Sequence, residues 1–332
     1  MPSPIPFFEA INAYQNSAAI NAAINLEVFT AIAEGVTTTE ALAERCSASP
    51  KGIRILCDFL VVMGTLTKES GRYGLTEDSA VFLNKHSPAY LGGTVRFLHS
   101  DTIKSAWADA TEFVRKGASV LPETGTMAPD HPVWRDFARA MVPMMAPPAE
   151  FIAQTCGMAP GTPCKILDVA AGHGMFGITM ARHNPAATVW ACDWDAVLDV
   201  AREHAHAAGV ADRFNTLAGS AFDIEFGSGY DVALVTNFFH HFNAATCETL
   251  IRKLHAALGP QGRVVTLEFV PDEDRVSPPV PAAFAIMMLA TTADGDAYTF
   301  GEYQRMFANA GFPKSEMLDV PMSPQRLIIS SK

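Results

Sequence analysis

A short glycine-rich stretch, KILDVAAGHGMFG at residues 165–177, carries the clearest signal for chemistry in this sequence. An apolar run too short for a helix ends near Asp168, and Gly172 and Gly174 lead into a segment with helical spacing. The pattern predicts a strand, a tight turn and a helix. Glycines at such a turn let the backbone approach a ligand and leave the first amides of the helix free. We therefore expect a cradle for a nucleotide-like cofactor.

The charges around this turn indicate which cofactor it holds. GHGMFG matches the G-x-G-x-x-G pattern of dinucleotide sites, but a carboxylate at Asp168 would repel a pyrophosphate. S-adenosylmethionine has no phosphate and carries a sulfonium and an ammonium, which a carboxylate attracts. Asp193 ends the next apolar run, where a ribose diol is held, and it suits either cofactor. We expect S-adenosylmethionine, with S-adenosylhomocysteine as the product; an NAD(P)-dependent oxidoreductase is an alternative.

Two adjacent histidines follow the fourth predicted strand, YDVALVTN. His240 and His241 come shortly after Asn237, at the edge of a parallel sheet where the cofactor lies. Imidazole has the unperturbed pKa best suited to proton transfer near neutrality, so His240 is a candidate base. Adjacent residues of a strand point apart, and no third ligand follows at a recognised spacing. No metal site is expected, although a metal-assisted reaction stays open.

The elements that position these residues divide the chain into three predicted segments. Residues 159–332 alternate strands and helices, which predicts a mostly parallel sheet with helices on both faces. Their last two strands, KSEMLDVPM and QRLIISS, have almost nothing between them and predict an antiparallel C-terminal hairpin. Residues 101–158 are expected to form a helical linker that contributes to the substrate pocket. The predicted fold class is therefore α/β, with a Rossmann-like sheet.

Residues 1–100 predict a separate, mainly helical domain with a winged-helix outline. A helical pattern at residues 7–33 carries almost no charge, and a two-stranded hairpin is expected to turn near Ser70 and Gly71. The formal net charge of −11 and the few basic residues of the second helix argue against nucleic-acid binding. An unpartnered apolar helix face predicts a homodimer through this domain. A winged-helix protein that only senses a cofactor is a further alternative.

The composition indicates the expected cellular location of the protein. The N-terminal residues lack a secretory signal, and no apolar stretch is long enough to span a bilayer, so we expect no membrane partner. The six cysteines contain no C-x-x-C pair, which favours buried free thiols, a cytoplasmic location and no structural zinc.

The whole pattern, from about Phe8 to the C-terminus, resembles the class I S-adenosylmethionine-dependent small-molecule O-methyltransferases of the caffeate, acetylserotonin and bacterial antibiotic type. These enzymes carry an N-terminal winged-helix dimerisation domain. The Asp-Val-Ala-x-Gly-x-Gly stretch is similar to their first motif, with Ala170 in place of the usual first glycine, and GSAFD lies where the family flanks adenine, with Ser220 in place of an acid. The resemblance implies these cofactor-binding residues: Asp168, Ala170, Gly172, Gly174, Asp193, Trp194, Ser220, Ala221, Phe222 and Asn237.

The same resemblance implies a catalytic group and an acceptor pocket. NFFHHFNAATCETLIRKLHAAL resembles the family's His-Asp-Trp stretch, which sets His240 on the catalytic histidine, Glu268 on a flanking acid and His241 on the aspartate. The second flanking acid falls at Ala297, beside Asp296. The implied acceptor is a hydroxyl of a small aromatic or polyketide-like molecule; C-methylation of an enolic or oxo-acid substrate, or N-methylation, stays open. The expected pocket residues are Trp134, Phe137, Met141, Met144, Met145, Phe284, Met287 and Met288.

Overall fold

The computed structural model describes residues 1–121 and 133–332. Its chain divides into two compact units, Met1–His99 and Ser100–Lys332, which are described here one at a time. Within the described residues, no helix is long and apolar enough to cross a membrane.

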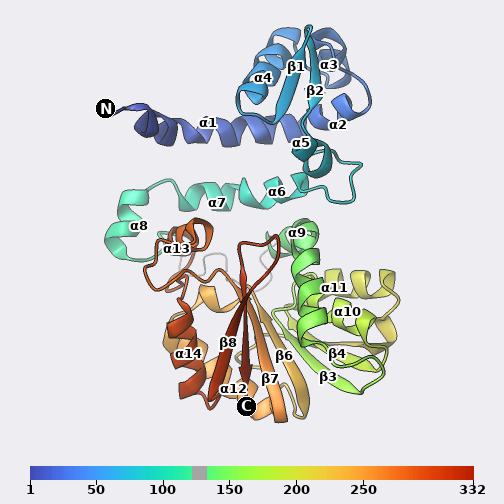
Figure 1. Ribbon diagram of the computed structural model, residues 1–332, viewed down its shortest axis with the longest axis vertical. Helices are drawn as coiled ribbons and strands as arrows, with labels where there is room; N and C mark the ends of the chain where they lie inside the picture. Colours follow the sequence, from blue (N-terminus) through green and yellow to red (C-terminus); the bar gives the residue numbers. More distant parts are fainter. Residues whose placement is uncertain (122–132) are drawn as a thin grey trace. The chain divides into compact units, whose positions relative to one another are not determined.

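The first unit is a small helical domain with a two-stranded wing (Figure 1). The helical pattern at residues 7–33 forms two helices rather than one, because Glu27 adopts a left-handed φ of 55° between them. The wing turns at Ser70 and Gly71, which have φ of 48° and 77°, as a two-residue hairpin turn requires. Its elements are α1 Ile5–Asn25, α2 Val28–Ala33, α3 Thr39–Arg45, α4 Pro50–Val62, β1 Leu66–Glu69, β2 Arg72–Leu75, α5 Glu77–Phe82, η1 Gly92–Thr94 and α6 Val95–Leu98.

The second unit is built around a seven-stranded sheet with strand order β5-β4-β3-β6-β7-β9-β8. Strands β3 to β7 pair in parallel, and β9 pairs antiparallel with both β7 and β8. The predicted parallel sheet with a C-terminal hairpin is confirmed. The strands are β3 Cys164–Val169, β4 Ala187–Asp193, β5 Phe214–Ala218, β6 Tyr230–Thr236, β7 Leu258–Glu268, β8 Lys314–Asp319 and β9 Arg326–Ser331.

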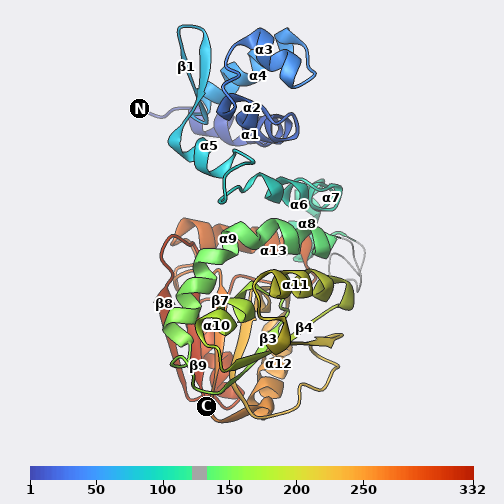
Figure 2. The same cartoon turned by 90° about the vertical axis from the view of Figure 1, so that its right-hand side faces the viewer.

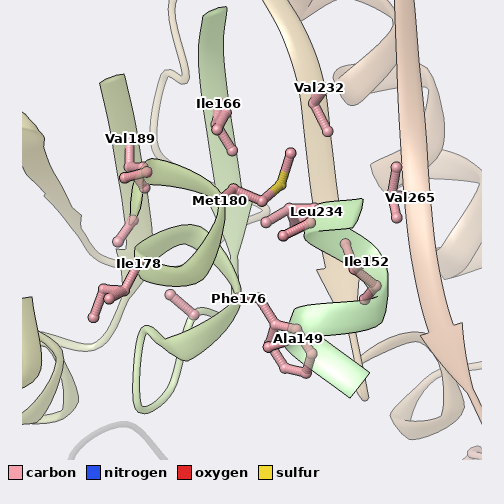
Figure 3. Packing of buried hydrophobic residues seen from close by; sticks show 14 of the residues in the cluster. Ala149, Ile152, Ile166, Phe176, Ile178, Met180, Val189, Val232, Leu234 and Val265 are labelled. Atoms are coloured by element: carbon pink, nitrogen blue, oxygen red, sulfur yellow. The ribbon is translucent and has the colours of Figure 1, made fainter. Parts of the chain in front are cut away.

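Helices cover both faces of this sheet (Figures 1 and 2). Helices α9, α10 and α11 pack on one face, and α12 and α14 pack on the other. Figure 3 shows Ile152 of α9 and Met180 of α10 near Leu234 of β6, in the hydrophobic cluster of the first of these layers. The helices are α7 Asp101–Ala106, α8 Ala110–Lys116, α9 Val133–Cys156, α10 Met175–His183, α11 Asp195–Ala207, η3 Ala211–Arg213, η4 Phe239–His241, α12 Ala244–Ala257, α13 Pro279–Thr291 and α14 Phe300–Asn309.

Candidate active site

The glycine-rich stretch forms a tight turn between β3 and α10. Ala170, Gly172 and Gly174 all adopt positive φ, at 53°, 56° and 73°. Ala170 is the one of the three with a Cβ, so its positive φ causes backbone strain that a glycine would avoid. Helix α10 then packs so closely on the sheet that a Cβ at Gly177 would lie 2.7 Å from Cγ1 of Val189. The turn therefore depends on glycine for its conformation and for its packing.

Asp168 lies beneath this turn, at the carboxyl end of β3, and is fully buried. Its Oδ2 accepts a hydrogen bond of 3.0 Å from the N–H of Gly177, whereas its Oδ1 is buried without a partner. Burial raises the pKa of Asp168 to about 7, against the effect of the Gly177 bond and with a smaller contribution from Asp193. An unpaired buried carboxylate oxygen suits a cationic ligand group better than a phosphate.

Asp193 ends the neighbouring strand β4 and joins two parts of the site. Its Oδ2 accepts from the N–H of Gly172 at 2.8 Å, and its Oδ1 accepts from the N–H of Trp194 at 2.7 Å. Burial raises its pKa to about 6, although both backbone bonds act in the opposite direction. Carboxylate oxygens can accept more than one hydrogen bond each, so these contacts leave lone pairs for a diol.

The stretch from Gly219 to Asp223 follows β5 and lies next to Asp193. The N–H of Gly219 donates to the carbonyl oxygen of Asp193 at 2.9 Å. Ser220 folds the stretch on itself, since its carbonyl oxygen accepts from Asp223 and its hydroxyl accepts from Phe222. The ring of Phe222 meets that of Phe242 edge to face at 5.0 Å. A backbone hydrogen bond thus joins the carboxyl end of β4 to this loop.

His240 and Glu268 form a buried pair at the carboxyl ends of β6 and β7. Nδ1 of His240 lies 2.5 Å from Oε2 of Glu268, and both side chains are buried. The other oxygen, Oε1, accepts from the N–H groups of Phe238 and Phe239, each at 2.9 Å. One carboxylate therefore orients both the imidazole and the backbone turn that carries it.

His241 does not follow the extended geometry assumed from the sequence. The two histidines lie in the single turn η4, so their rings do not point apart as strand residues would, and their centroids are 4.3 Å apart. Nδ1 of His241 is buried without a partner, and the ring meets Trp134 edge to face at 5.9 Å. Burial, with a smaller contribution from His240, holds the pKa of His241 well below its usual range. His241 is therefore neutral at physiological pH.

Asp296 lies near the η4 turn, but its carboxylate interacts with another residue. Its N–H donates to the carbonyl oxygen of His240 at 3.1 Å, while its carboxylate lies 3.6 Å from the guanidinium of Arg275. Ala297, at the expected position of the second acid, is fully buried. Glu268 is thus the carboxylate that contacts the His240 ring within the described residues. Across the part of the chain that the structure describes, no group of three or more His, Cys, Asp or Glu residues is arranged to hold a metal ion.

The structure brings several of the expected pocket residues together, and one of them is more exposed than the rest. The ring of Phe284 lies 4.9 Å from that of His240 and stacks on Phe269 at 4.1 Å. Trp134 contacts both Phe137 and His241. Met141 and Met145 pack against the core layer of α9, α10 and the sheet, Met288 is buried, and Met287 is half-buried. Met144 differs, since it is 38% exposed.

Asn237 is held by a residue that the sequence did not indicate. It adopts φ of 54° at the end of β6, its Oδ1 accepts from Nε2 of Gln325, and its Nδ2 donates to Sδ of Met145 at 3.6 Å. Gln325 is 1% exposed and lies just before β9. No motif or spacing marks this contact, because the two residues are far apart in the sequence.

Comparisons with known proteins identify the family. A family model described as an O-methyltransferase domain matches residues 161–313, and a model described as an O-methyltransferase dimerisation domain matches residues 8–85. The crystal structure of a candidate O-methyltransferase from Nostoc punctiforme is 48% identical, with a TM-score of 0.96 over 100% of both chains. The chain belongs to the O-methyltransferase family, and it is an S-adenosylmethionine-dependent enzyme with an N-terminal dimerisation domain.

One further relative is similar in sequence, and one solved structure is similar in fold. The tetracenomycin polyketide synthesis 8-O-methyltransferase TcmO of Streptomyces glaucescens is 27% identical over 304 residues, covering 90% of this chain and 88% of that protein. Human N-acetylserotonin methyltransferase in complex with S-adenosylmethionine shares the fold, with a TM-score of 0.85 at 20% identity over 98% of this chain and 96% of that one. The hypotheses of hydride transfer and of a cofactor-sensing regulator are therefore set aside.

Proposed function

We propose that this enzyme transfers a methyl group to a hydroxyl of a small aromatic or polyketide-like acceptor, with His240 as the general base. The observation that carries this proposal is the buried His240–Glu268 pair, with Nδ1 and Oε2 2.5 Å apart, at the carboxyl ends of two central strands. These strand ends form the edge of the sheet where ligands of such folds bind.

Glu268 sets the role of His240. A carboxylate bonded to Nδ1 keeps the proton on that atom, so Nε2 is the ring nitrogen that accepts the proton of the acceptor hydroxyl. Phe284, whose ring meets the imidazole, forms part of the wall beside it. Bound S-adenosylmethionine supplies an electrophilic methyl group on its sulfonium. The residues of the chain therefore need to align the acceptor and make its oxygen anionic at the moment of attack.

We assign the cofactor to the turn and the two neighbouring acids. Asp168, with its unpaired buried oxygen, fits the methionine ammonium, either directly or through water or backbone. Asp193 fits the ribose hydroxyls, and Ser220, Ala221 and Phe222 fit the adenine. Ala170, Gly172, Gly174, Trp194 and Asn237 complete the assigned cofactor site.

The acceptor class follows from the walls of the site. Phe284, Met287 and Met288 of α13, together with aromatic and methionine side chains of α9, offer apolar surface with few polar groups, which suits a flat aromatic ring. TcmO, whose name refers to polyketide synthesis, is similar along most of its length. We place α9, which lies in the described part of the segment 101–158, at the acceptor side of the site; residues 122–132 of that segment lie outside the described residues.

We also propose that the protein is a homodimer through its N-terminal domain. The first turns of α1 expose Ile5, Phe7, Phe8, Ile11 and Tyr14, each with more than half of its surface free in a single chain. Exposed apolar patches of this kind mark interfaces. The dimerisation-domain family model matches residues 8–85, so a second copy of this domain is the natural partner.

A turnover assay tests the proposed function directly. The protein is incubated with S-adenosylmethionine and a panel of phenolic probes such as 1-naphthol, 1,8-dihydroxynaphthalene and hydroxyanthraquinones, and products are followed by mass spectrometry and NMR. A methyl ether on a phenolic oxygen is the expected product. A methyl group on a ring carbon or on nitrogen, or tight binding of the cofactor with no methylated phenol in the panel, would contradict the proposal.

A further inference from the structure

Lys253 of α12 contacts the loop that follows β5. Its Nζ donates to the carbonyl oxygens of Ala221 and Phe222, at 3.0 and 2.9 Å, and lies 4.6 Å from the centre of the Phe226 ring. The side chain is half-buried between the helix and the loop. One ammonium group thus makes three contacts with a stretch of six residues, two of them charge-assisted hydrogen bonds and one a cation–π contact.

The loop held by Lys253 is joined to the cofactor site at its other end. Gly219 donates to the carbonyl oxygen of Asp193, and the Asp193 carboxylate in turn accepts from Gly172 in the glycine turn. Phe222 contacts Phe242, just beyond the turn that carries His240. The loop is thus anchored on the ribose side by backbone and on the far side by Lys253.

We infer that Lys253 is a positioning residue for the adenine of the cofactor, acting through residues 219–223 without touching the ligand. This inference rests on the proposed placement of adenine against that loop. Ser220 stands where the resembling enzymes have an acid, so the loop offers no side-chain carboxylate at that position. Its backbone and the Phe222 ring must then supply the contacts, and their positions depend on the two carbonyl groups that Lys253 binds.

Lys165 provides a matched control. Its Nζ also donates to a backbone carbonyl, that of Ser228 at 2.8 Å, and it lies over the rings of Trp190 and Tyr230 at 4.8 and 4.2 Å. It lies at the amino end of β3, whereas the cofactor turn follows the carboxyl end of the same strand. Loss of Lys165 therefore removes a similar set of contacts from a place where no ligand is assigned.

The test is isothermal titration of S-adenosylhomocysteine into the full-length protein and its variants, with melting temperatures measured in parallel. Lys253→Met should raise Kd about tenfold, which corresponds to about 1.4 kcal/mol. Lys253→Arg, which keeps the charge and donors, should recover most of the affinity. Lys165→Met should leave Kd unchanged even where it lowers the melting temperature.

A loop variant separates the two ways in which the inference can fail. Phe222→Ala should also weaken binding, because it removes a proposed adenine contact. If Phe222→Ala weakens binding and Lys253→Met does not, the adenine placement stands and the role of Lys253 is wrong. If neither changes Kd, the placement itself is wrong and the inference falls with it. Equal losses in Lys253→Met and Lys165→Met would show a general effect of stability and would also overturn it.

Discussion

Nδ1 of His240 and Oε2 of Glu268 lie 2.5 Å apart in the interior of the protein, and the same carboxylate binds the backbone of Phe238 and Phe239. This arrangement gives Glu268 two tasks. It selects the imidazole tautomer, and it fixes the turn that presents the imidazole at the end of β6. Both tasks can be tested by changing the charge of Glu268 without changing its shape.

Glu268→Gln should lower kcat about a hundredfold or more, with little change in the Kd of S-adenosylhomocysteine. An amide NH₂ facing Nδ1 favours the tautomer that carries its proton on Nε2, which cannot act as the base, and general-base catalysis typically contributes this much. Steady-state kinetics with an acceptor found in the turnover assay provides the measurement. Wild-type kcat in the Gln variant would show that Glu268 does not set the tautomer.

Cofactor affinity should depend on pH through Asp168. Because its pKa is raised to about 7, the carboxylate is ionised above that pH, and a cationic ligand binds this form better. Affinity should therefore be full near pH 8 and fall by up to about tenfold per pH unit below 7, with Asp193, whose pKa is raised to about 6, contributing at lower pH. Titrations of S-adenosylhomocysteine between pH 8 and 5.5 measure this dependence.

Asp168→Asn is the matched variant for this pH dependence. It should bind more weakly at pH 8 and show a flatter profile below it. The raised pKa has the opposite effect on folding stability. A raised carboxyl pKa means that the folded state holds its proton more tightly, so the ligand-free protein should lose stability as pH rises from the ordinary value of 3.8 to about 7, and the Asn variant should lose less. A wild-type profile in Asp168→Asn would contradict the assignment of Asp168 to the ammonium.

Much of the fold could be predicted because its signals are local. The glycine turn after Asp168, the strand-helix alternation and the terminal hairpin each depend on short patterns of apolar residues and turn residues. Ser70 and Gly71 were placed at the wing turn for the same reason. The helix break at Glu27 could not be predicted, because the apolar spacing continues across it although the helix does not.

The parts of the site that could not be predicted depend on contacts between distant segments. Gln325 meets Asn237 only because β9 lies beside β7, which in turn lies beside β6. The position of His241 against Trp134 follows from the η4 turn, which replaces the expected extended geometry. Sequence spacing gives residue types near a strand end, but the partner of each polar atom requires the packed structure.

The apolar start of α1 should control the oligomeric state. A charged group placed in a buried apolar interface is costly to desolvate, so Phe8→Asp with Ile11→Asp should convert a dimer to a monomer. Light scattering at micromolar concentration measures the mass. Val62→Asp, at an exposed position of α4, is the control and should leave the mass unchanged. A wild-type protein that is monomeric, or a dimer that persists in the double variant, would exclude this interface.

The most direct test of the account is the kcat of His240→Gln, compared with that of His241→Gln, toward an acceptor with a weakly acidic hydroxyl at neutral pH. General-base catalysis typically contributes about a hundredfold to ten-thousandfold, so His240→Gln should lose that much with cofactor affinity little changed, and His241→Gln should lose far less. Raising the pH should partly restore the His240 variant, because an ionised hydroxyl needs no base. Near-full activity of His240→Gln at neutral pH would contradict the base role and leave alignment alone as the source of catalysis.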